Sequence, residues 1–192
     1  MELVLQPLNL SHQEAFLEFT DENIGARYYS PEDFHKLYDL SCHHGHSFCY
    51  VLVNRVDGQI YGVRVTYPPS RWLQLETAPL FTDRWNVPPE SVAYFKSLFI
   101  SSQLQGKGWG PKLSQASLQD LRAMGCQAVV AHSWKESPNN SSMRYLEKLG
   151  FKAIGEHPLF WSEVDYDCTR CGKPPCQCTA IEMILYLEPI SS

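Results

Sequence analysis

Three glycines alternate with other residues in a short segment that can bind a phosphate group. The segment reads Gln105-Gly106-Lys107-Gly108-Trp109-Gly110, and Pro111 follows at the predicted start of a helix. Glycine lets the backbone turn sharply and approach a ligand closely, and the unpaired N–H groups of a helix start favour an anion. The spacing fits neither the P-loop nor the Gly-x-Gly-x-x-Gly dinucleotide pattern. The segment alone leaves two interpretations, a pyrophosphate site and a tight turn without a ligand.

Four of the seven cysteines follow one another closely near the end of the chain, as C-x2-C and then C-x-C. Thiolates are common ligands of structural zinc, and Gly172 allows the tight turn of a zinc knuckle. We predict that a structural Zn²⁺ is held by Cys168, Cys171, Cys176 and Cys178. The alternative is a cysteine-rich surface turn without metal. A redox role is disfavoured because no thioredoxin-like βαβ unit surrounds the first pair.

A second tract, Cys42-His43-His44-Gly45-His46, also contains metal-ligand residue types. Adjacent histidines cannot easily converge on one ion, and no carboxylate or cysteine recurs at a suitable spacing. We therefore expect a solvated loop between a helix and a strand. Cys42, Cys49 and Cys126 are interpreted as small buried apolar residues or incidental free thiols.

The overall composition excludes several classes of protein. The chain has 192 residues, of which 44% are hydrophobic and 12% aromatic, so wholesale disorder is excluded. A net charge of −5 supplies no basic face for nucleic acid. No apolar run reaches the roughly eighteen residues that cross a bilayer, and Glu2 stands where a signal peptide carries bases. We expect a cytoplasmic protein with no nucleic-acid or membrane partner.

Hydrophobic periodicity predicts the element order β-α-α-β-β-β-α-β-α-β-β. The strands are predicted at residues 3–8, 48–54, 59–67, 92–100, 128–134, 152–161 and 180–187. Asp57-Gly58 predicts a hairpin, and the helix at 111–124 makes a βαβ unit with its flanking strands. The fold class is therefore α/β, a mixed sheet with helices on both faces. We expect a single domain over 1–192, with a Cys-rich insertion at about 165–179 between the last two strands.

Cap residues predict where the helices begin, and prolines mark a long loop. Ser11 and Glu14 have capping-box form, Ser30 precedes Pro31, and a later helix is predicted at 139–149. Residues 68–90 hold five prolines and are predicted to form a long surface loop over a site or a hydrophobic face.

Two segments, in the right order, resemble the GNAT superfamily of N-acetyltransferases. Residues 98–110 are similar to the family's acetyl-CoA loop, whose pattern of Arg or Gln, two residues, Gly, one residue, then Gly or Ala is filled by Gln105, Gly108 and Gly110. Residues 139–151 are similar to its later helix, which begins near an Asn and ends in Glu-Lys-x-Gly-Phe. The spacing of the two segments and the order of the elements along nearly the whole chain also agree with the family.

The resemblance implies a GNAT-like fold and the transfer of acetyl from acetyl-CoA to a primary amine, by direct attack in a ternary complex. The acceptor would be a small molecule or a peptide, and a homodimer is possible by resemblance alone. Backbone amides of the glycine loop would bind the CoA pyrophosphate, and the preceding strand and Asn139 would contact the pantetheine arm. The implied cofactor-binding residues are Leu98, Phe99, Ile100, Gln105, Gly106, Lys107, Gly108, Trp109, Gly110, Asn139 and Ser142.

The catalytic residues are harder to assign. The tyrosine that commonly protonates the departing thiolate in the family aligns with Leu146, and Tyr145 stands one residue, about 100° of helix, earlier. Tyr145 is nevertheless the candidate acid. The candidate bases are Tyr94 and His132, on strands beside the expected cofactor site, and Glu76 in the long loop.

Two further hypotheses concern the acceptor and the type of protein. The aromatic residues Tyr28, Tyr29, Trp72 and Trp85 could line an acceptor pocket, or simply pack in the core. Because Leu146 replaces the usual tyrosine, the alternative to an enzyme is a non-catalytic acyl-CoA-binding or protein-interaction module that docks partners through its Cys-rich lobe.

Overall fold

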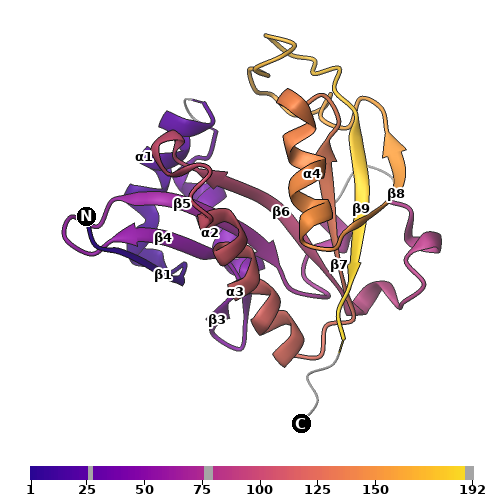
Figure 1. Cartoon of the computed structure of the whole chain (residues 1–192), viewed down its shortest axis with the longest axis horizontal. Coiled ribbons are helices and arrows are strands. Elements are labelled where there is room, and N and C mark those ends of the chain that lie inside the picture. Colours follow the sequence, from indigo (N-terminus) through magenta and orange to yellow (C-terminus); the bar gives the residue numbers. More distant parts are fainter. Residues whose placement is uncertain (26–27, 76–79, 189–192) are drawn as a thin grey trace.

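The computed structural model describes residues 1–25, 28–75 and 80–188, and its centre is one seven-stranded sheet in the order β1-β4-β5-β6-β7-β9-β8 (Figure 1). The strands are β1 (Leu3–Pro7), β4 (Tyr50–Asn54), β5 (Ile60–Tyr67), β6 (Val92–Ile100), β7 (Ala128–Trp134), β8 (Lys152–His157) and β9 (Ala180–Tyr186). Strands β6 and β7 run parallel, and the other neighbours in this sheet run antiparallel. The predicted hairpin and βαβ unit are both present.

Helices cover both faces of the sheet, as predicted. One face carries α1 (Gln13–Asn23) and α2 (Pro31–Ser41), and the other carries α3 (Trp109–Ala123) and α4 (Ser141–Lys148). Alternate residues of a strand point to opposite faces. Tyr94 of β6 therefore joins the core under α1 and α2, whereas Phe95 joins the core under α3 and α4.

Strands β6 and β7 separate halfway along their length. They pair only from Val92 with Ala128 to Phe95 with Ala131. At that point Phe95 of β6 pairs with Thr66 of β5, and Ser97 pairs with the adjacent Val65. Lys96 has no paired residue in β5 and is therefore the extra residue of a β-bulge. A bulge bends the strand that contains it. Beyond it β6 stays paired with β5 and β7 with β9, so a wedge opens between the two strands in the middle of the sheet.

Two helix starts differ from each other in how well the sequence predicted them. Ser30 caps α2 as expected, because its hydroxyl accepts from the Asp33 N–H at 3.1 Å while Asp33 accepts from the Ser30 N–H. The capping box at Ser11 was wrong. Asn9 accepts from the Ser11 N–H at 3.0 Å and caps a short 3-10 turn, Leu10–His12, before α1 begins. An Asn side chain readily reaches the N–H two residues on, and here it takes the cap position.

Several boundaries and one hairpin are also different from the prediction. The helix predicted at 139–149 begins at Ser141, because Asn139 and Asn140 have a left-handed backbone, φ +53°. The strand predicted at 152–161 ends at His157, where the chain turns. The histidine tract forms a small hairpin, β2 (Cys42–His43) with β3 (His46–Ser47). Within it, His46 contacts Asp120 at 2.7 Å and takes part in no metal-ligand cluster among the described residues.

The proline-rich loop is held on the molecule by its two tryptophans. Trp72 and Trp85 are buried, and their indole N–H groups donate to the Val92 carbonyl at 2.9 Å and to Glu182 at 2.7 Å. The loop therefore covers a hydrophobic face, as predicted, and Glu76 lies outside the described residues. No helix in the described part of the chain is long and apolar enough to span a bilayer.

Candidate functional site

The free edge of β6 leads directly into the glycine loop. After Ile100 comes a single 3-10 turn, Ser102–Leu104, and then the loop that ends in α3. Gly106 and Gly108 have φ of +73° and +80°, a left-handed backbone that side chains rarely allow. Gly108 is the N-cap of α3 and no side chain caps the helix there. The start of α3, a helix of 15 residues, is therefore available to stabilise a bound anion.

Side chains around the loop add positive charge and fix its ends. The amide of Gln105 donates to the Ile100 carbonyl at 3.1 Å and so ties the loop back to β6. Lys107 is exposed at the tip, and the Lys112 Nζ lies 4.3 Å from the centroid of the Trp109 ring. The structure brings the predicted cofactor residues from Leu98 to Gly110 together on one side of the wedge.

Tyr145 lies beside the first turn of α3. A Cβ placed on Gly110 would lie 3.2 Å from Leu98 and 3.5 Å from the ring of Tyr145, so no larger residue fits there without movement. The Tyr145 hydroxyl donates to the Gly110 carbonyl at 3.0 Å. It also bonds to the Ser114 hydroxyl at 2.7 Å. Tyr145 therefore lies next to the free edge of β6 as well as to the glycine loop.

A buried arginine determines the direction in which the hydroxyl groups of Ser114 and Tyr145 donate their hydrogen bonds. Arg64 is 2% exposed, and its guanidinium donates to the Ser114 oxygen from Nη2 at 2.9 Å and from Nε at 3.1 Å. Ser114 must then donate its own proton to Tyr145, and the Tyr145 proton goes to Gly110. The ring of Phe95 lies 4.2 Å from the guanidinium carbon.

The position of Leu146 explains why the tyrosine is displaced by one residue. Leu146 is 6% exposed and packs in the core under α4 together with Phe95 and Phe151. Neighbouring helix residues point about 100° apart. With Leu146 directed into the core, Tyr145 is directed toward α3.

Tyr94 and His132, the predicted bases, contact each other on the opposite face of the sheet. The Tyr94 hydroxyl lies 2.9 Å from Nδ1 of His132, and Nε2 of the same ring lies 3.7 Å from Glu182. Both predicted side chains are buried. The ring of Tyr94 stacks on Trp72 with centroids 4.6 Å apart.

Glu182 is a charged group at the centre of this network that sequence analysis missed. It accepts from His157 at 2.6 Å, from Trp85 at 2.7 Å and from the backbone N–H of Phe81 at 3.2 Å. Burial alone would raise the pKa of Glu182, but the neighbouring His132 imidazole and the hydrogen bonds from Trp85, His157 and the Phe81 N–H lower it to about 2. The carboxylate is therefore ionised and saturated with donors. Although His132, His157 and Glu182 lie within metal-ligand distance, we interpret them as a hydrogen-bonded network.

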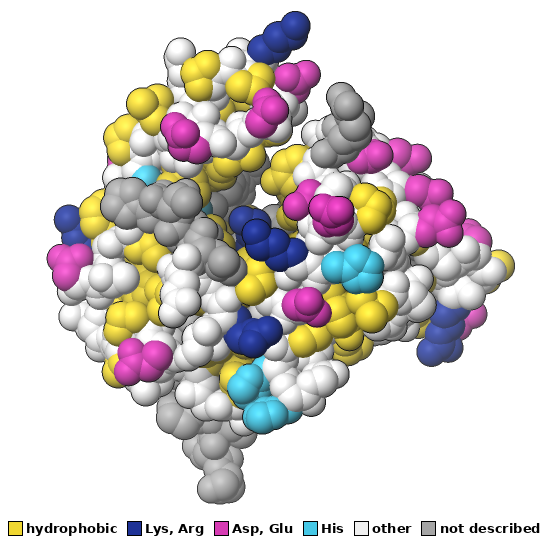
Figure 2. Space-filling model, turned by 180° about the vertical axis from the view of Figure 1, so that it is seen from behind, with side chains coloured by type: hydrophobic (Ala, Val, Ile, Leu, Met, Phe, Trp, Pro, Cys, Tyr) yellow, Lys and Arg dark blue, Asp and Glu magenta, His cyan; other side chains and the backbone are white. Residues whose placement is uncertain are grey.

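A large hollow of about 920 Å³ opens on the α1 and α2 face. Figure 2 shows this side of the molecule, with acidic side chains on the rims of the hollow. Its aromatic lining comprises Tyr28, Tyr29, Tyr67, Trp72 and Tyr166. Its charged lining comprises Asp33, Asp165, Asp167, Lys36 and Lys96. Three of the four aromatic residues proposed for an acceptor pocket line this hollow, whereas Trp85 does not. Because Lys96 is the bulge residue, the hollow reaches the point where β6 and β7 part.

The remaining predicted residues lie at the edge of the wedge or in the Cys-rich lobe. Asn139 is exposed, and the Ser142 hydroxyl accepts from the Trp134 N–H at 3.2 Å, which ties the start of α4 to β7.

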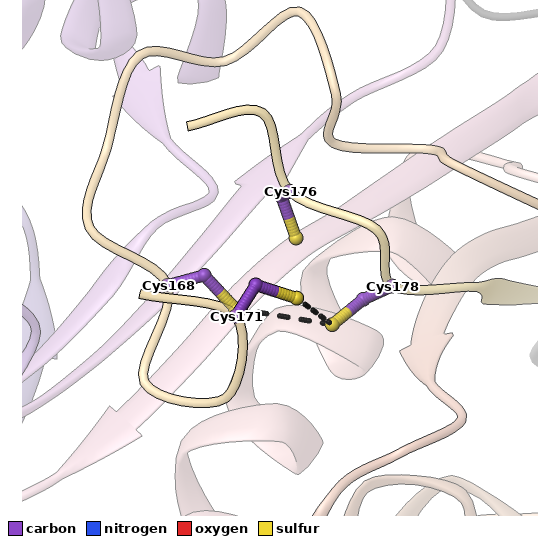
Figure 3. Close-up of side chains that lie close together, drawn as sticks. All are labelled: Cys168, Cys171, Cys176 and Cys178. Atoms are coloured by element: carbon purple, nitrogen blue, oxygen red, sulfur yellow. Dashed lines mark hydrogen bonds between the residues drawn. The ribbon is translucent and has the colours of Figure 1, made fainter. Parts of the chain in front are cut away.

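The four clustered cysteines point toward one another in the segment between β8 and β9 (Figure 3). Cys49 and Cys126 are buried free thiols, as predicted, and Cys42 is partly exposed.

Comparison with known proteins gave one family and many structures of the same fold. Residues 13–151 match the family described as Acetyltransferase (GNAT) family. The ribosomal-protein-S18-alanine N-acetyltransferase of Escherichia coli is 14% identical with a TM-score of 0.66, over 99% of this chain and 96% of that chain. The polyamine N-acetyltransferase of Drosophila melanogaster is 16% identical with a TM-score of 0.63, over 97% and 100% of the two chains. NAA60 of Arabidopsis thaliana is 15% identical with a TM-score of 0.68, over 96% and 97%. A search among curated protein sequences found no significant match.

Proposed function

The chain belongs to the GNAT acetyltransferase family and is an acetyl-CoA-dependent N-acetyltransferase, and we propose that it transfers the acetyl group to a cationic primary amine by direct attack in a ternary complex. One observation carries the proposal. The uncapped start of α3 is continuous with the free edge of β6, and the hollow opens at the same wedge from the opposite face. The two substrates can therefore meet between the separated strands.

Acetyl-CoA would bind on the α3 side. Its pyrophosphate would accept hydrogen bonds from the backbone amides of residues 105–110, with Lys107 nearby as a point charge. Its pantetheine arm carries amide groups that can pair with the backbone of Leu98, Phe99 and Ile100, because this stretch of β6 has lost its neighbour β7. The N–H group of Ile100, which points away from β5 because the neighbouring Ser101 N–H donates to Tyr61 on the β5 side, is the candidate to stabilise the oxyanion of the tetrahedral intermediate.

The acceptor amine would enter from the hollow. Three aspartates against two lysines line it, together with five aromatic rings. Carboxylates attract an ammonium group by charge and aromatic faces attract it by their quadrupole. The solved relatives named above act on a polyamine and on the alanine of a ribosomal protein, acceptors that share a primary amine. A positively charged small molecule or peptide therefore fits this hollow best.

Deprotonation of the ammonium can proceed through Tyr94. The amine proton passes to the Tyr94 oxygen while the Tyr94 proton moves to Nδ1 of His132. The imidazolium that forms lies beside the ionised carboxylate of Glu182, which stabilises its charge. The neutral amine then attacks the thioester carbonyl.

Protonation of the leaving thiolate falls to Tyr145 on the other face. Its proton is shared with the Gly110 carbonyl, and Ser114 can resupply the phenolate oxygen with a proton. Tyr145 lies next to Gly110 and Leu98, beside the free edge of β6 along which the pantetheine arm would run.

The release of free thiol from acetyl-CoA over a panel of amines tests this function. We expect turnover with cationic primary amines and less with neutral amines of the same size. Binding of CoA without turnover on any amine would instead support a non-catalytic acyl-CoA-binding protein.

A further inference from the structure

The sulfur atoms of the Cys-rich lobe are spaced as in a tetrahedral metal site. The Cys178 Sγ lies 3.8 Å from Cys168 and 3.6 Å from Cys171, and the four sulfurs all lie within 4.8 Å of one another (Figure 3). A tetrahedral zinc ion with Zn–S bonds of about 2.3 Å separates its ligands by about 3.8 Å. A disulfide would need a sulfur–sulfur distance of about 2.05 Å, and all four cysteines are free thiols.

The backbone around the sulfurs is arranged as a knuckle. Cys168 and Gly172 exchange two backbone hydrogen bonds of 2.8 Å, and Gly172 makes the turn with φ of +80°. The N–H of Gln177 donates to the Cys171 sulfur at 3.4 Å. Backbone donors of this kind stabilise the negative charge of a metal-bound thiolate.

The lobe has little apolar material of its own. Its core consists of Cys168, Cys176 and Cys178, packed against Trp134, Trp161 and Tyr166. The segment around them is rich in exposed polar residues. Such a segment cannot gain enough from burial to order itself, whereas metal binding contributes folding free energy directly.

The sulfur cluster is joined to the wall of the hollow. Asp165, Tyr166 and Asp167 line the hollow and directly precede Cys168. The Tyr166 hydroxyl donates to the Cys176 sulfur at 3.5 Å. Its ring lies 6.3 Å from the ring of Tyr28, which also lines the hollow and lies between α1 and α2 in the sequence. Tyr166 therefore has one end on the sulfurs and its ring in the hollow.

We propose that Cys168, Cys171, Cys176 and Cys178 hold one structural Zn²⁺, and that this ion fixes the wall formed by residues 165–167 and so controls the binding of the acceptor amine. The second half of the proposal rests on the proposed function, because it assigns the hollow to the acceptor. The glycine loop precedes a different element, α3, and none of residues 105–110 is among the residues packed in the sulfur cluster, so we expect the metal to leave the pyrophosphate site unchanged.

Metal analysis of the full chain, purified without added metal, tests the first half. We expect about one zinc per chain, about none in Cys178→Ser, and an unchanged content in Cys42→Ser, which removes a thiol of the β2–β3 hairpin. A content below about half an equivalent in the wild type would overturn the site. One equivalent of iron with visible absorption would overturn the choice of zinc, since four thiolates also suit iron.

Steady-state kinetics and CoA titration test the second half. For Tyr166→Phe, which keeps the ring and loses the O–H···S bond, we expect full zinc content, an unchanged Kd for CoA and a rise of about tenfold in the acceptor KM. For Cys178→Ser we expect a larger rise in acceptor KM. An acceptor KM unchanged in Tyr166→Phe would overturn the proposal that the metal site controls acceptor binding. This holds even if Cys178→Ser fails to fold. If the wild type contained zinc but turned over no amine, the result would contradict the proposed function and still support the metal site.

Discussion

The hydroxyl of Tyr145 donates a hydrogen bond to the carbonyl oxygen of Gly110, 3.0 Å away, and so joins α4 to the first turn of α3. The two helices are the walls on one side of the wedge between β6 and β7. Through Ser114 the same hydroxyl is linked to the buried Arg64. Tyr145, the proposed acid, thus connects the proposed pyrophosphate site to the core beneath it.

Tyr145→Phe tests the acid. We expect kcat to fall by about 10² because the thiolate must leave unprotonated, an effect in the usual range for one acid. The Kd for CoA should rise only a few-fold, from the loss of the bond to Gly110. The matched control is Tyr61→Phe, which removes an exposed hydroxyl bonded to Gln59 in the hairpin. A kcat equal to that of the control would exclude Tyr145 as the acid.

Tyr94→Phe tests the base. At neutral pH we expect kcat/KM for the amine to fall by about 10², since the proton can no longer pass to His132. The defect should shrink as the pH approaches the pKa of the amine itself, where the acceptor is already neutral. The pH profile of both enzymes with one amine measures this. A defect that is the same at every pH would point to a packing role for Tyr94 beside Trp72.

Glu182→Gln tests the network behind the base through stability. The pKa of Glu182 is lowered from 4.5 to about 2 in the folded protein, so its contribution is present above about pH 4.5 and is lost as the pH falls toward 2. The contribution is on the order of 3 kcal/mol. Urea unfolding at pH 7 and pH 3 should show a smaller difference in the variant than in the wild type. Glu156→Gln, which removes an exposed carboxylate paired with Lys135, should keep the wild-type difference.

Asp165→Asn tests the charge of the hollow. For a cationic amine we expect the acceptor KM to rise roughly threefold, as for the loss of one exposed charge interaction, and less so at high salt. For a neutral amine the KM should not change. Asp83→Asn, an exposed aspartate outside the lining, is the control. Equal effects on the cationic and the neutral amine would contradict an electrostatic role.

The sequence predicted those parts of the molecule that depend on local patterns. Asp57-Gly58 and the glycines of residues 105–110 specify turns through their own backbone preferences, and α2 begins where Ser30 and Asp33 cap each other. The order of helices and strands along the chain followed from these patterns. The match of Gln105, Gly108 and Gly110 to one family pattern was local in the same way.

The parts that escaped prediction depend on contacts between distant segments. Glu182 and His157 meet His132 only because β8, β9 and β7 are neighbours in the sheet, and the single local signal was a charged residue inside the apolar strand at 180–187. The bulge at Lys96 is a property of the pairing with β5, not of β6 alone. The direction of Tyr145 is set by the burial of its neighbour Leu146.

The affinity of the protein for CoA after substitution of Gly108 tests the central claim most directly. Gly108 and Gly58 have φ of +80° and +76°, and a Cβ on either would meet no atom within 4 Å. Gly108→Leu and Gly58→Leu should therefore suffer similar backbone strain and similar losses of stability. We predict that Gly108→Leu weakens CoA binding at least 100-fold by calorimetry, because its side chain blocks the approach of the pyrophosphate to α3, and that Gly58→Leu binds CoA like the wild type. Equal affinity in the two folded variants would contradict the assignment of the loop and of the reaction built on it.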